Sequence, residues 1–340
     1  MTVPPRPIPP VKARHFPPPP PLAPKPTGLW RRTPPAIFPP MMGLFGLGLG
    51  WRVLAAQPGM SPVAPVSDVI LGATALLYAF ALIAWISKPL RRPLVVLEDL
   101  SVLPGRAGLA ALALCLALLS AAIAPYQPTL ALGIVVAALV ALITIGMLIG
   151  WAMMTGPEEA RVVTPVFHLS FAGYIMAPLS LIQLGYTGFS TGVLIATTAA
   201  AFAIWFVSLR QLIKRIPPAP LRPLLAIHLA PASLFSVVSA QLGFPEIAFG
   251  FALLALGILA CLILFLRWIL VAGFTPLWGA LTFPLAASAS ASILSLGEVG
   301  LWIGSLLLFL ATGFIPWVAM KILKSWASGQ LAAKTNAATA

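Results

Sequence analysis

Residues 130–153 read LALGIVVAALVALITIGMLIGWAM and contain no charged side chain. A helix of about 20 mostly apolar residues crosses the hydrocarbon layer of a bilayer. The stretch does not alternate between apolar and polar residues, as a strand of a membrane barrel would. It therefore predicts a helix that spans a membrane.

The rest of the chain repeats this character, because 60% of its residues are hydrophobic and only 8% are charged. A soluble core could not hide so many apolar residues, so the class indicated is an all-α integral membrane protein. Ten transmembrane helices are expected. Their approximate bounds are 36–54, 67–86, 105–124, 130–153, 166–184, 191–209, 224–243, 247–266, 277–296 and 300–320.

The two ends of the chain differ from this membrane domain, which is expected over residues 34–324. Residues 1–33 are basic, rich in proline and free of acids, which predicts a disordered tail or a ligand for proline-binding domains. They lack the apolar central region of a cleavable signal peptide, so the first span is expected to serve as the targeting signal. Residues 325–340 are expected as a short, loose tail.

Positive charge predicts the orientation of the spans. Of the 20 lysine and arginine residues, all but Arg52 fall in the tails or in loops that follow even-numbered spans. Short cytoplasmic loops retain positive charge, so both termini are expected in the cytoplasm of a bacterium, with the spans in its inner membrane. The net charge of +13 then reflects topology. Nucleic-acid binding is not expected, because no soluble domain carries clustered base-stacking aromatics.

Prolines predict that the spans form two layers. Pro39 and Pro40, Pro178, Pro231 and Pro284 lie in the first, fifth, seventh and ninth spans, and the last three are 53 residues apart. This period suggests repeated helical hairpins. A proline frees a carbonyl, which is tolerated at membrane depth where it is buried or lines a cavity. We expect five kinked inner helices and five straighter outer ones; the alternative is a closed bundle that the prolines merely shape. The third span has no central proline.

Small residues gather on the first and ninth spans. Gly43 and Gly46 lie in the first, and Ala287 and Ser290 follow Phe283 at helical spacing in the ninth. Such bare surfaces either pack closely against a neighbour or border a lumen, and close packing is the commoner explanation.

Three stretches resemble the tellurite-resistance/dicarboxylate transporter family, which includes bacterial tellurite-resistance proteins, plant slow anion channels and fungal malate and sulfite transporters. They are PPAIFPPMMGLFGLGLGW (34–51), PLRPLLAIHLAPASL (220–234) and FTPLWGALTFPLAASAS (274–290). The resemblance implies five tandem helical hairpins around a central pore, and commonly a homotrimer with one pore in each subunit. It covers residues from about 33 to about 324.

The resemblance also implies a role for Phe283, within TFPL of the ninth span. In the family a phenylalanine at this position plugs the pore. Ala287 and Ser290 would then leave space for its ring to swing aside. Without the resemblance, an ordinary core aromatic beside small residues is the favoured interpretation of Phe283.

The positions of the seven acids favour anions as the transported species, because all seven lie outside the middle of the expected spans. Cation pathways usually need buried carboxylates, whereas helix N-termini favour anions. Chloride, nitrate, a dicarboxylate or tellurite are candidates. Two mechanisms stay open: an anion channel, and a proton-coupled carrier of dicarboxylates such as malate, with tellurite resistance as an associated phenotype.

A few further side chains are candidates for control. His168 and His228 could make flux sensitive to pH if they line the pore, or could simply bond to backbone. Arg52 could attract anions to an outer vestibule or anchor its helix. Cys115 and Cys261 are expected to pack inside the protein, and no metal site or cofactor is expected.

Catalysis is not expected. Intramembrane enzymes need an activated nucleophile, a pair of aspartates or a metal motif within the spans. Ser288, Ser290 and Ser292 have no base nearby in the sequence. The chain is therefore expected not to be an enzyme.

Overall fold

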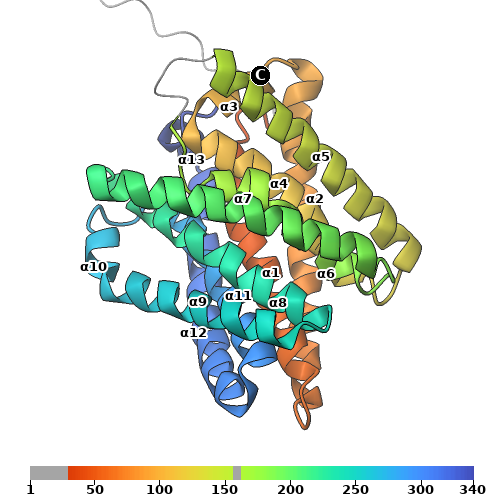
Figure 1. Cartoon of the computed structure of the whole chain (residues 1–340). Helices are drawn as coiled ribbons and strands as arrows, with labels where there is room; N and C mark the ends of the chain where they lie inside the picture. Colours follow the sequence, from red (N-terminus) through yellow and green to blue (C-terminus); the bar gives the residue numbers. More distant parts are fainter. Residues whose placement is uncertain (1–29, 156–161) are drawn as a thin grey trace, which may run out of the picture.

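The computed structural model describes residues 30–155 and 162–340, and every regular element in them is helical, as expected (Figure 1). The long helices are α1 (Phe38–Ala55), α2 (Ala64–Arg91), α4 (Leu103–Ile123), α5 (Pro128–Thr155), α7 (Thr187–Lys214), α8 (Leu229–Gln241), α9 (Pro245–Leu264), α11 (Thr282–Ser295) and α12 (Gly297–Ala327). Short elements are η1 (Pro35–Ile37), η2 (Ser61–Val63), α3 (Val95–Ser101), η4 (His168–Ala172), η5 (Gly173–Met176), α6 (Pro178–Leu181), η6 (Ala219–His228), α10 (Leu266–Ile269), η7 (Pro276–Leu281) and α13 (Gln330–Lys334). Most of the expected tail, residues 1–29, lies outside the described residues.

Nine segments of the described chain are long and apolar enough to cross a membrane, and they match nine of the ten expected spans. The exception is 166–184, where the chain forms η4, η5 and α6 in place of one helix. η4 is a π-helix and η5 a 3₁₀ helix. Pro178 has no N–H to continue the preceding turns, and it is the first residue of α6. Ten crossings thus remain a prediction.

Burial divides the long helices into the two expected layers. In the segments that contain α1, α4, α8 and α11, 67–83% of the hydrophobic window is buried, against 22–33% for α2, α5, α7, α9 and α12. Residues 166–181 are mostly buried and belong to the inner layer. The outer helices expose large apolar side chains such as Leu76 and Trp302, which suits contact with lipid. Cys261 is also exposed there, so only Cys115 packs inside as expected.

The inner elements form a closed ring. Helix α1 contacts α4, α4 contacts the broken segment η4–η5–α6, that segment contacts α8, α8 contacts α11, and α11 returns to α1. Each inner element also packs against the outer helix that follows it in the chain. Figure 1 shows three of these outer helices, α5, α7 and α9, on the face toward the viewer. The chain therefore surrounds a single axis with successive helical hairpins.

The inner prolines lie in the first turns of the α-helical segments, and kinks at these positions stay a prediction. Pro39 and Pro40 lie in the first turn of α1, Pro178 is the first residue of α6, and Pro231 and Pro284 are the third residues of α8 and α11. A 3₁₀ segment precedes each of these helices. Proline fits a first turn because the N–H that it lacks would have no partner within the helix there. Helix α4 also has a proline in its first turn.

Glycine allows α1 and α11 to pack closely, as the commoner interpretation of the small residues predicted. A Cβ atom added to Gly43 would overlap the Thr282 side chain. One added to Gly46 would lie 2.8 Å from Cδ2 of Phe283. Neither residue can therefore gain a side chain unless the two helices separate.

We expect Gly43→Ala to lower the thermal stability of the detergent-solubilised protein, with a cost of about 1–3 kcal/mol for forcing α1 from α11. Gly72→Ala on α2 is the matched control, because nothing lies within 4 Å of its added Cβ atom. Equal melting temperatures for the two variants would contradict close packing at Gly43.

The C-terminal residues are packed against the protein, in contrast to the expected loose tail. Gly329, with a φ of 72°, ends α12 and turns the chain into α13. The side chain of Leu331 is buried, and the N–H of Ala340 donates to the carbonyl oxygen of Arg31 at 3.0 Å. The two ends of the membrane domain therefore lie on the same side of the molecule.

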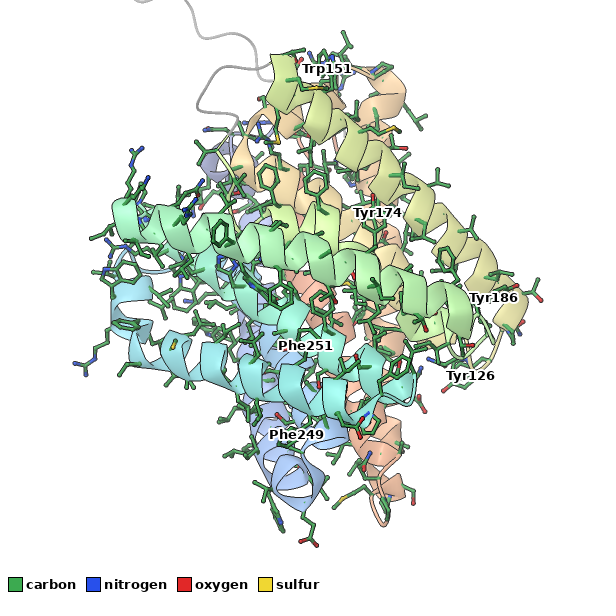
Figure 2. All side chains as sticks on the ribbon, in the orientation of Figure 1. Tyr126, Trp151, Tyr174, Tyr186, Phe249 and Phe251 are labelled. Atoms are coloured by element: carbon green, nitrogen blue, oxygen red, sulfur yellow. The ribbon has the colours of Figure 1, made fainter. Side chains whose placement is uncertain are left out.

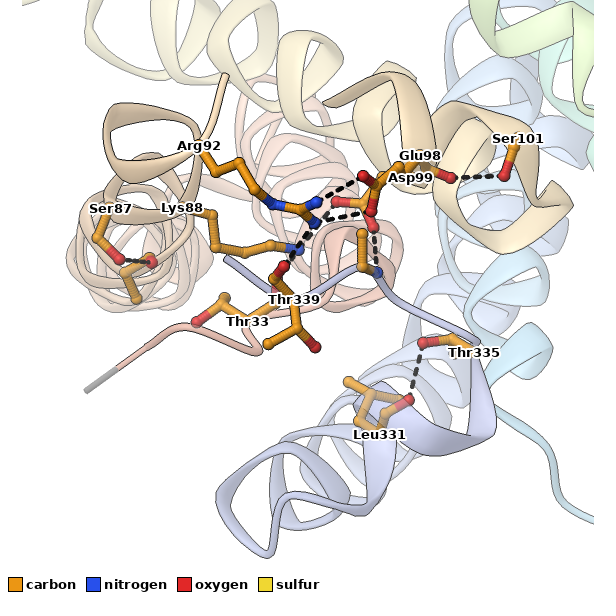
Figure 3. A network of polar contacts seen from close by, with 12 residues as sticks. Thr33, Ser87, Lys88, Arg92, Glu98, Asp99, Ser101, Leu331, Thr335 and Thr339 are labelled. Carbon is orange, nitrogen blue, oxygen red and sulfur yellow. Dashed lines mark hydrogen bonds and ion pairs between the residues drawn. The ribbon is translucent and has the colours of Figure 1, made fainter. Parts of the chain in front are cut away.

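A buried ion pair holds this C-terminal segment (Figure 3). Lys88 Nζ lies 2.9 Å from Asp99 Oδ2 and 3.0 Å from the carbonyl oxygen of Thr33, and both charged side chains are inaccessible to solvent. The other oxygen of Asp99 accepts the N–H of Ala338 at 2.8 Å. Burial raises the pKa of the Asp99 carboxyl, while Lys88 and the Ala338 N–H oppose that shift. The carboxylate thus links α2 to the end of the chain.

Candidate functional site

A cavity of about 50 Å³ lies among the inner elements and takes lining residues from all five of them. Its volume is enough for a few water molecules, each of which needs about 10–15 Å³ by this measure. The lining residues are Ala36, Pro39, Met42, Pro104, Ala107, Leu114, His168, Leu169, Ala172, Gly173, Ile175, Met176, Leu224, Ile227, Ala230, Pro231, Leu234, Pro276, Leu277, Gly279, Ala280 and Pro284.

The cavity lies at one end of the inner helices, around their first turns. Pro39, Pro104, Pro231 and Pro284 line it from the first turns of α1, α4, α8 and α11. The third span, which lacks a central proline, also lines the cavity, through Pro104, Ala107 and Leu114 of α4.

The structure brings only part of the sequence-predicted set to this cavity. Pro39, Pro231, Pro284 and His168 line it. The following candidates are not among its lining residues: Pro40, Gly43, Gly46, Pro178, Phe283, Ala287 and Ser290. Gly43 and Gly46 instead form the contact between α1 and α11.

Phe283 is 2% exposed and is not among the residues that line the cavity. Its ring packs over Gly46 of α1, while the next residue, Pro284, is the last residue of α11 that lines the cavity. Ala287 and Ser290, on the following turns of α11, are buried and border no part of it. The Phe283 ring is therefore packed between α11 and α1, next in the chain to a residue that lines the cavity.

The two candidate histidines form a pair. Nε2 of His168 and Nδ1 of His228 are 2.9 Å apart, so one ring nitrogen donates a hydrogen bond to the other. Nδ1 of His168 is buried and has no hydrogen-bond partner in the described part of the chain. The indole N–H of Trp205 donates to the carbonyl oxygen of His228 at 3.2 Å. Among the described residues that line the cavity, His168 supplies the one titratable side chain.

Arg52 joins α1 to the C-terminal end of α4. Its Nη1 donates to the carbonyl oxygens of Ala121 and Ala122 at 3.2 and 2.9 Å, at the C-terminal end of α4. An arginine satisfies such free carbonyls and complements the helix dipole. Asp68 lies 3.9 Å away and Tyr126 is stacked near the guanidinium. This geometry favours the anchoring role over the expected attraction of anions.

Comparison with known families decides the class of protein. A family model described as voltage-dependent anion channel matches residues 32–323, which include every inner element and the cavity. The chain belongs to the voltage-dependent anion channel family. This confirms the resemblance seen in the sequence. Members of the family are channels or transporters and not enzymes, so the protein is a multi-pass membrane protein that passes small anions. A search of curated proteins finds no match.

The charges of this anion-channel family member fit its class. No acidic residue lines the cavity, and the described acids lie elsewhere: Asp68, Glu98, Asp99, Glu246 and Glu298. Glu158 and Glu159 lie outside the described residues. Within the described chain, no group of three or more histidine, cysteine, aspartate and glutamate side chains could hold a metal ion.

Sequence reasoning missed several of the residues that shape the cavity. Pro276, Leu277 and Gly279 line it from η7, the 3₁₀ segment before α11. Hydropathy does not distinguish such a segment from an α-helix, because both expose the same side-chain chemistry. The one available signal was the proline that follows each 3₁₀ segment.

Proposed function

We propose that the protein is an anion channel whose conduction route follows the axis of the inner elements through the central cavity. The observation that carries this proposal is that the first turns of α1, α4, α8 and α11 surround a cavity without carboxylates. The apolar lining binds anions weakly enough to let them leave. Chloride and nitrate are the simplest candidates.

We further propose that Phe283 closes this route. Its ring is buried against Gly46 of α1, and the next residue, Pro284, lines the cavity. The small side chains of Ala287 and Ser290 follow on α11, so little side-chain volume would hinder a rotated ring. A hydrophobic constriction of this kind can stop ions without any fixed charge.

The proposed orientation places both termini in the cytoplasm and the ten crossings in the inner membrane of a bacterium. The contact between Ala340 and Arg31 supports a common side for the two ends. Figure 2 shows Tyr126 near one end of α5 and Trp151 near the other. They are separated by about 37 Å of helix, which suits aromatic belts at the two edges of a bilayer. A homotrimer is proposed from the resemblance alone.

The test is electrical. We expect the purified protein in planar bilayers to carry current whose reversal potential follows a chloride or nitrate gradient. The same gradient imposed with an impermeant anion should give no such shift. A cation-selective current would overturn the proposal.

A second candidate function is a proton-coupled carrier of dicarboxylates such as malate, and His168, which lines the cavity and pairs with His228, favours it. For the channel, we expect a pH gradient to leave the reversal potential unchanged, because anions alone carry the current. For the carrier, the reversal potential moves with pH, and malate uptake into liposomes saturates and is lost in His168→Asn. Under either function, tellurite resistance would be an indirect result of altered anion permeability.

A further inference from the structure

A second, larger cavity lies beside the central one and has a strongly positive wall. Its volume is about 630 Å³, and it is bordered by the end of α12, by α13 and by the starts of η6 and η7. Pro104, Pro276 and Leu277 border both cavities, so the two share a wall. We call this second cavity the basic vestibule.

Three lysines supply the charge of the basic vestibule: Lys321, Lys324 and Lys334. No acidic residue of the described chain lines it. The ammonium group of Lys321 lies 4.4 Å from the ring centre of Trp317 and 5.0 Å from that of Phe274, which fixes its position. Lys324 and Lys334 are exposed, and neither has an ion-pair partner among the described residues. Two positive charges therefore remain free to act on ions in the cavity.

The lysine on α13 is held in place by the network around Asp99. Ala338 and Thr339 follow α13. The N–H of Ala338 donates to the carboxylate of Asp99 on the short helix α3, and the carbonyl oxygen of Thr339 accepts from Arg92, the residue after α2 (Figure 3). Arg92 is itself fixed by two bonds of 2.7 Å to Glu98. Lys334 thus belongs to a fixed wall.

Polar groups without partners also occur in this wall. The hydroxyls of Thr275 and Ser325 are buried and have no hydrogen-bond partner in the described chain, and both residues border the basic vestibule. Each hydroxyl can donate a hydrogen bond but has no acceptor within the described chain.

We propose that the basic vestibule is the loading chamber from which small inorganic anions enter the central cavity, with Lys324 and Lys334 raising their local concentration. This inference rests on the proposed channel function. A cleft lined by charge of one sign concentrates counter-ions, and salt screens the effect. The Debye length is about 30 Å at 0.01 M salt and about 3 Å at 1 M, so the effect acts at low salt only.

The test compares chloride currents of the wild-type, Lys324→Gln/Lys334→Gln and Lys324→Arg/Lys334→Arg proteins, each also in a Phe283→Ala background. At low salt we expect the glutamine variant to lose about threefold or more of the current carried by chloride from the vestibule side. The loss should vanish at 1 M salt, and the arginine variant should keep the current. Lys214→Gln/Arg215→Gln, at the end of α7, removes the same charge away from the basic vestibule and should have no effect.

The outcomes separate the two proposals. Anion current that is identical in the wild-type and glutamine variants at low salt would overturn the loading chamber and leave the channel standing. An equal loss in the Lys214→Gln/Arg215→Gln control would mean that surface charge in general, and not the basic vestibule, attracts the anions. Absence of anion current from every protein, the Phe283→Ala variants included, would overturn the channel, and the loading chamber with it.

Discussion

Phe283→Ala is expected to raise the anion current by on the order of tenfold or more, because it removes the buried ring that we propose closes the route beside the central cavity. The measurement is chloride and nitrate conductance per reconstituted protein in planar bilayers. The substitution also removes a buried side chain and should cost about 3–5 kcal/mol of stability. A rise in current despite this cost would indicate a gate.

Phe45→Ala is the matched control for this experiment. Phe45 is as fully buried as Phe283 and lies on α1, but its ring faces Tyr78 of the outer helix α2 at 5.9 Å between ring centres. We expect a similar loss of stability without a rise in current. If both variants conduct equally, leakage through a loosened protein explains the current and Phe283 is an ordinary core aromatic.

Asp99→Asn is expected to give the second large effect, a loss of about 3–5 kcal/mol of stability, because it leaves the buried ammonium of Lys88 without a counter-charge. The readout is the melting temperature of the detergent-solubilised protein. Lys88→Met/Asp99→Leu should recover part of the loss, since apolar side chains can replace a buried pair. Recovery would be incomplete, because the carbonyl of Thr33 loses its donor.

The pair formed by Arg92 and Glu98 is the control for the buried pair. Its side chains are 43% and 48% exposed, so water screens the attraction between their opposite charges. Glu98→Gln should cost only about 0–1 kcal/mol. An effect of Asp99→Asn no greater than that of Glu98→Gln would contradict the anchoring role of the buried pair.

The layers of this fold were predictable from sequence, but the details of the inner layer were not. Hydropathy locates nine spans because lipid demands long apolar helices, and proline marks the inner ones. The segment 166–184 was expected as one helix because its composition is as apolar as that of its neighbours. Its division into η4, η5 and α6 depends on neighbouring helices that cover the interrupted backbone.

The site was predictable only in part, since its contacts join distant parts of the sequence. His168 and His228 were each recognisable as titratable groups, but nothing local indicates that they meet. Asp99 lies in a loop region by sequence and is nevertheless fully buried, because Lys88 and the C-terminal segment cover it. Lys334 likewise gains its place in the basic vestibule only through contacts made by the residues that follow it.

The glycine contact between α1 and α11 also has a consequence for biosynthesis. Roughly 240 residues separate Gly46 from Phe283, and ribosomes add about 5–20 residues per second, so α1 waits about 10–50 s for its partner. During this interval the circle of inner helices cannot be completed. The glycine face of α1 is open to lipid, to the insertion machinery or to other nascent helices. Assembly of the inner ring is therefore a late, post-insertion event that depends on a helix made near the end of translation.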